Sequence, residues 1–77
     1  MISMLKEYIY DKRFQLLIVD NSIDVVNYID IISFNDKNII IKCPNYILDI
    51  GGTSLIITKL IDTEIIINGQ IDSIKFK

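Results

Sequence analysis

The amino-acid sequence predicts a small all-β domain, a single domain of short, mostly antiparallel strands arranged as a sandwich or a roll. Two observations carry this prediction. Apolar residues make up 51% of the 77-residue chain, and most of them are isoleucine, whose stiff branched side chain suits a pleated sheet. The apolar runs are short and are separated by turn-forming pairs, among them Pro44-Asn45, Gly51-Gly52 and Asn68-Gly69. A chain of this length forms one domain with a thin core.

Residues 1–13 form an N-terminal arm whose structure the sequence leaves open. Met4, Leu5, Tyr8 and Ile9 would share one face of a helix, yet the same segment also fits an edge strand. Its apolar run is too short for a signal peptide, and no run elsewhere is long enough for a membrane span. We therefore expect a cytoplasmic chain.

The all-β domain occupies residues 14–77 and begins with a hairpin. Residues 14–19 and 23–28 have strand composition, and the Asp20-Asn21-Ser22 segment between them is typical of a tight turn. A third strand is expected over residues 29–34 and ends at a polar loop.

The second half reads as four or five further strands, from Ile39 to the C-terminus. Gly51-Gly52 is expected to let the chain reverse tightly. Asn68-Gly69 also resembles a turn, but the alternation of apolar and polar residues continues through it, which favours one bent or bulged strand. Runs spaced about ten residues apart leave a short solenoid-like stack as an alternative, although a solenoid needs several repeats to hold a core.

The sequence offers no catalytic, metal-binding or cofactor-binding constellation. It has no histidine, which removes the commonest general base and metal ligand. Cys43 is most simply a small apolar residue at a strand end. The segment from Asp20 to Asp24 is similar to the start of a calcium loop, but Val25 replaces its central glycine and Ile31 its closing glutamate.

Composition also limits the partners. The net charge is −2 and the basic residues are scattered, which argues against nucleic acid. A small domain with this apolar fraction should present part of its surface to a partner protein or to copies of itself, so we expect a homo-oligomer.

The C-terminal segment follows the pattern Ile-x-Gly-x-Ile-x-x-Ile-x-Phe, with Gly69 and Phe76 at the glycine and aromatic positions. In this pattern, and from about Leu17 to Phe76, the chain resembles the YabP/YqfC family of sporulation proteins from endospore-forming Firmicutes. Val26 departs from the family pattern, and Lys12-Arg13 stands in place of its Pro-Arg. Small size and an early start look closer to YqfC than to YabP.

The resemblance implies a non-enzymatic mother-cell protein that contributes to formation of the spore cortex and envelope. It further implies pairing with a sporulation membrane protein, YqfD for YqfC or YabQ for YabP. The chain would then lie peripherally at the forespore outer membrane, held by that partner. Asn27, Tyr28 and Gly69 match the family motif and are candidate functional positions, although a structural role for each is the simpler interpretation.

Three functions follow as hypotheses: an adaptor for a membrane protein, a self-assembling structural protein, and a small β-barrel that binds a ligand. Self-assembly would use strand edges. The candidate edge segments are the two isoleucine triplets, represented by Ile39, Ile41, Ile65 and Ile67.

Overall fold

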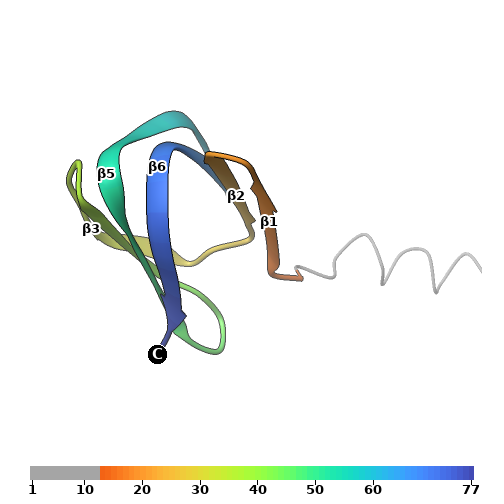
Figure 1. Cartoon of the computed structure of the whole chain (residues 1–77). Helices are drawn as coiled ribbons and strands as arrows, with labels where there is room; N and C mark the ends of the chain where they lie inside the picture. The colour runs from red at the N-terminus through yellow and green to blue at the C-terminus, as the bar shows by residue number, and fades with distance from the viewer. Residues whose placement is uncertain (1–12) are drawn as a thin grey trace, which may run out of the picture.

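The computed structural model describes residues 13–77; the rest of the predicted N-terminal arm, residues 1–12, lies outside the described residues. Residues 13–77 contain no helix and form one six-stranded sheet in the order β1-β2-β6-β5-β4-β3, with every pairing antiparallel (Figure 1). The prediction of a small, antiparallel all-β fold is therefore confirmed. The strands are β1 (Gln15–Val19), β2 (Ser22–Val26), β3 (Asp30–Phe34), β4 (Asn38–Lys42), β5 (Ile47–Ile61) and β6 (Glu64–Phe76).

The first hairpin forms where the sequence predicts it. Val19 of β1 pairs with Ser22 of β2, so the connection is the two-residue turn Asp20-Asn21. Asp20 takes a φ of 51°, a left-handed conformation that aspartate tolerates better than most residues. Ser22 begins the second strand and is not part of the turn.

The prediction of a reversal at Gly51-Gly52 is wrong, because both glycines lie inside β5. The register of β5 against β6 shifts between them and again between Thr53 and Ile56, so the strand bulges and bends. A Cβ atom on Gly52 would lie 2.1 Å from the Gln70 carbonyl oxygen. Glycine is required here for close approach of two backbones, and the chain continues in the same direction.

The prediction of a continuous, bent strand through Asn68-Gly69 is confirmed, because β6 runs unbroken from Glu64 to Phe76. Gly69 has a φ of 142°, and a Cβ atom there would lie 2.6 Å from the Ser54 carbonyl oxygen. The bends of β5 and β6 thus face each other, and the two long strands curve over together (Figure 1).

The curve turns one sheet into a roll. The runs spaced about ten residues apart lie along one long hairpin, so the solenoid-like alternative is not found. The outermost strands, β1 and β3, do not pair with each other, so the sheet also stays open and forms no closed barrel.

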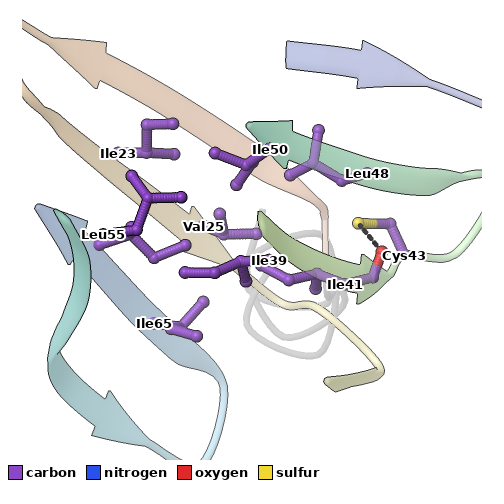
Figure 2. Packing of buried hydrophobic residues seen from close by; sticks show 10 residues of the cluster. Ile23, Val25, Ile39, Ile41, Cys43, Leu48, Ile50, Leu55 and Ile65 are labelled. Carbon is purple, nitrogen blue, oxygen red and sulfur yellow. Dashed lines mark hydrogen bonds between the residues drawn. The ribbon is translucent and has the colours of Figure 1, made fainter. Parts of the chain in front are cut away.

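Both halves of the bent sheet contribute to a single apolar core. β2 and the first half of β6 supply side chains from one side, and β4 and the first half of β5 from the other (Figure 2). No polar or charged residue among residues 13–77 belongs to this core. The core residues are Ile23, Val25, Ile39, Ile41, Cys43, Leu48, Ile50, Leu55, Ile65 and Ile67.

An aromatic cluster closes one end of the roll. Tyr46, just before β5, makes edge-to-face contacts with Phe14 and Phe76, at centroid distances of 5.5 and 4.9 Å. These contacts connect the start of β1 with the end of β6, two segments that belong to opposite halves of the sheet.

Candidate interaction surface

The isoleucines proposed from the sequence as edge contacts are core residues. Ile39, Ile41, Ile65 and Ile67 are all buried. β4 lies between β3 and β5, and the first half of β6 lies between β2 and β5, so neither triplet forms an exposed edge. Their role in the structure is packing.

The positions matching the family motif have backbone and packing roles. Asn27 has a φ of 65°; its backbone N–H donates to the Thr63 carbonyl, and its side-chain amide donates to the Arg13 carbonyl. It therefore ties the end of β2 to the β5–β6 turn and to the start of β1. Tyr28 packs against the core, and Gly69 forms the bend of β6.

Exposed apolar side chains gather on the two outermost strands and on the second half of β5. Phe34 is 65% exposed and Leu17 is 60% exposed, although both are large apolar residues. Their neighbours on the same strands are similarly accessible. The exposed apolar residues on these strands are Leu17, Ile18, Val19, Ile32, Phe34, Ile56, Leu60 and Ile61.

We use the name outer face for the convex side of the half-sheet formed by β1, β2, the first half of β6 and the second half of β5. Strand register places its residues in cross-strand rows, alternating with rows that point into the core. Its margins carry the apolar residues Leu17 and Val19 on β1 and Ile56 and Ile61 on β5, with Lys59 between the last two, whereas its central strands carry Asp24 and Glu64. The three rows are Gln15-Val26-Glu64-Ile61, Leu17-Asp24-Ile66-Lys59 and Val19-Ser22-Asn68-Ile56.

The charged centre of the outer face holds two carboxyl groups, and a lysine on the adjacent β5 reaches one of them. The Lys59 ammonium lies 3.5 Å from a Glu64 carboxylate oxygen. Asp24 Oδ1 is buried without a hydrogen-bond partner. Desolvation, a hydrogen bond with Glu64 and the Glu64 charge raise the pKa of Asp24, and Lys59 opposes this only in part. The centre of the face therefore holds two neighbouring carboxyl groups, of which Asp24 gives up its proton less readily than a free aspartate.

A groove lies where the β3–β4 turn meets the bulge of β5. Its volume is about 340 Å³, and four of the seven residues that line it are isoleucine or leucine. The turn is fixed to β5 by two backbone bonds, from Leu55 N–H to the Asp36 carbonyl at 2.8 Å and from Gly52 N–H to the Lys37 carbonyl at 3.0 Å. The lining residues are Phe34, Asn35, Asp36, Ile39, Leu55, Ile56 and Ile57.

The chemistry available elsewhere is limited. Burial raises the pKa of the Cys43 thiol, which lies 3.8 Å from the Ile41 carbonyl oxygen, so this thiol is poorly placed to react. Within the described part of the chain, no group of three acidic, cysteine or histidine side chains is arranged to hold a metal ion. Residues 13–77 also contain no helix that could cross a membrane.

These features define a class: a small all-β protein with one curled sheet and uncovered apolar surface. The family model of the YabP family matches residues 12–77, and the chain belongs to this sporulation-associated family. No curated protein and no solved structure matches the chain.

The structure adds features that the sequence analysis did not single out, namely the outer face, the groove and the open edge of β1. The first and last of these had a signal in the sequence. Residues 14–19 are uncharged and apolar apart from Gln15, yet a strand with one solvated face should alternate.

Proposed function

We propose that the protein is a non-enzymatic sporulation protein of the mother cell, which contributes to cortex and envelope formation by binding a sporulation membrane protein. Membership of the YabP family supports the link to sporulation. The resemblance to YqfC supports a membrane partner of the YqfD type. Such a partner would hold this chain at the outer forespore membrane.

The observation that carries the binding role is the uncovered apolar surface. Ile56 and Ile61 on β5 are more than half exposed, and they border the charged centre of the outer face. Removing apolar surface of this kind from water is favourable by about 25 cal/mol per Å² before the entropic cost of association is subtracted, and the polar groups between the apolar margins add specificity.

We propose no catalytic role for the chain. The chain has no histidine, and its single thiol is buried. The two carboxyl groups of Asp24 and Glu64 lie on a convex face and not in a cleft, where a substrate would be held.

The test is an affinity capture of the tagged chain from sporulating cells, solubilised in mild detergent and analysed by mass spectrometry. We expect one membrane protein in stoichiometric amount. Ile56→Lys and Ile61→Lys place charge on the apolar margin and should abolish its recovery. Ser33→Lys, at an exposed polar position on β3, is the matched control and should retain it.

Recovery of this chain alone, in large particles, would contradict the adaptor role and favour a self-assembling structural protein. Equal loss of the membrane protein with Ser33→Lys would show that the outer face is not its binding site.

A further inference from the structure

The bent sheet leaves unpaired strand edges, and most of them carry features that block pairing with another chain. On β3 the register shifts between Ile31 and Ser33, which marks a bulge, and the Ile31 N–H donates to the Asp30 side chain at 2.8 Å. This donor faces the free edge and is already satisfied. Bulges, and charged side chains that occupy the N–H groups of an edge, protect edge strands from further pairing.

The free edges of the two long strands are also protected. The second half of β5 has a register shift between Ile57 and Lys59, and Lys59 is charged. The last part of β6 carries Asp72 and Lys75. Charged side chains disfavour the approach of a second strand.

β1 has none of these protections. Its sequence, Gln-Leu-Leu-Ile-Val, contains no charge and no proline, and its register against β2 is regular from end to end. Leu17, Ile18 and Val19 are each at least half exposed. Among the strand edges of residues 13–77, β1 is therefore the one open to pairing.

The direction of the free backbone groups on β1 follows from the bonds of β2. Gly69 N–H donates to the Asn21 carbonyl, and Asn27 N–H donates to the Thr63 carbonyl, so odd-numbered residues of this segment bond toward β6. Because successive residues in an antiparallel ladder alternate sides, even-numbered residues of β2 bond to β1. Register then directs the backbone groups of Leu16 and Ile18 to the free edge.

We propose that β1 pairs antiparallel with β1 of a second copy of this chain, about a two-fold axis at Leu17. In this register all five residues of the strand overlap, and Leu16 of each copy forms a hydrogen-bonded pair with Ile18 of the other. Leu17 then faces its own equivalent on the outer face. This register uses both residues whose backbone groups point outward, and it is self-complementary as a two-fold interface requires.

The charge distribution around β1 supports a second copy of this chain as the partner that pairs with its edge. The strand itself is uncharged, so two acidic chains do not repel along the seam. At each end, the register places Arg13 of one copy beside the Asp20-Asn21 turn of the other, which brings opposite charges together. The pairing would join two sheets into one of twelve strands and bury the free edge of β1.

A cross-linking experiment tests the register in the full chain. In a non-hydrogen-bonded antiparallel pair the Cα atoms lie about 4.5 Å apart, within the range of about 4.4 to 6.8 Å that a disulfide spans. Leu17→Cys should therefore give a disulfide-linked dimer under mild oxidation. Val19→Cys is the control, because it has similar exposure on the same face, yet its two copies would be about four residues, or roughly 13 Å, apart along the strands.

Equal cross-linking of the two variants, or of neither, would overturn the proposed pairing. The native thiol of Cys43 is buried and should stay unmodified in both.

A second measurement is sedimentation velocity of the native chain, for which we expect a dimer. Ile18→Pro removes an N–H that has no partner within its own sheet, so it should give a folded monomer with an unchanged circular dichroism spectrum. Phe34→Lys, on the protected β3 edge, should leave the dimer intact.

A native chain that stays monomeric at every concentration, or a dimer that survives Ile18→Pro, would overturn the inference. Neither result bears on capture of the membrane protein, so this inference and the proposed function fail separately.

Discussion

Gly52 and Gly69 show how two residues without side chains determine the shape of the sheet. Each lies where β5 and β6 bend, and each faces a backbone carbonyl at a distance that no Cβ atom tolerates. Because the bends face each other, the hairpin folds over as one unit and brings β2 opposite β4. The core exists only because this bend is possible.

We predict that Gly69→Ala destabilises the fold by about 2–4 kcal/mol, because it combines a positive φ with a backbone clash. The control is Gly51→Ala, whose Cβ would meet only the mobile end of the Ser73 side chain, at 2.9 Å. Urea unfolding followed by circular dichroism measures both. Equal midpoints for the two variants would show that the bend does not depend on Gly69.

The charged form of Asp24 is unfavourable in the folded chain, because desolvation and the neighbouring Glu64 raise its pKa. Its raised pKa means that the folded chain holds the proton more tightly than the unfolded chain does. The stability linked to that proton is fully present below the ordinary value of 3.8 and is lost as the pH rises through the folded-state pKa.

We therefore predict that Asp24→Asn stabilises the protein at pH 7, since the amide is neutral and can donate to Glu64. The gain should be less than about 1 kcal/mol, because solvent screens this partly exposed site, and it should vanish below pH 3.8. Thermal unfolding across pH measures it. A gain that persists unchanged in acid would contradict the electrostatic cause.

The pKa of Asp49 is shifted in the opposite direction from that of Asp24. Hydrogen bonds from Asn38 and Lys77 lower its pKa, so its contribution is present above pH 3.8 and is lost as the pH falls through the folded-state pKa. Asp49→Asn should therefore destabilise the protein at pH 7 and have little effect in acid. Thermal unfolding of this variant at both pH values measures it, and a stabilisation at pH 7 would be contrary to the assignment.

Among the strands, the contrast between β1 and β3 is the most informative. Both are outermost, both have five residues and both expose large apolar side chains. Only β3 has a bulge and a side chain that binds its outward N–H. The two edges therefore differ in whether another strand can add, which limits assembly to one side of the sheet.

We predict that Asp30→Ala produces larger, concentration-dependent particles, because it frees the Ile31 N–H on the second edge. Asp30→Asn removes the same charge but keeps an oxygen that can accept this N–H, so it should behave like the native chain. Static light scattering compares the three proteins. Equal scattering from both variants would mean that charge, and not the hydrogen bond, protects β3.

The sequence predicted the strands well because short isoleucine-rich runs and polar turns are local signals. The first hairpin and the unbroken strand through Gly69 follow from turn chemistry and side-chain alternation. Gly51-Gly52 was misinterpreted because a glycine pair is equally suited to a reversal and to a close approach, and only Gln70, about twenty residues away, distinguishes the two. Which strands lie at the edges depends on the sheet order, a long-range property of which the sequence carries one local sign, the missing alternation in residues 14–19.

At the scale of the whole molecule, one bent sheet encloses a thin core on its concave side and leaves its convex side exposed. Among residues 13–77, ten buried residues form that core, while much of the apolar content remains on the outer face and on β1. Within residues 13–77 there is one sheet and no second layer on its convex side. Membership of the YabP family and this uncovered surface together support a protein that acts by binding other proteins during sporulation.

The most direct test of this account is deletion of the gene in an endospore-forming host that encodes it, followed by electron microscopy of the developing spores and a count of heat-resistant spores. We predict normal vegetative growth, a thin or missing cortex and a strong loss of heat resistance, restored by the native gene but not by the Ile56→Lys, Ile61→Lys double variant. Normal cortex and full heat resistance in the deletion strain would contradict the proposed function.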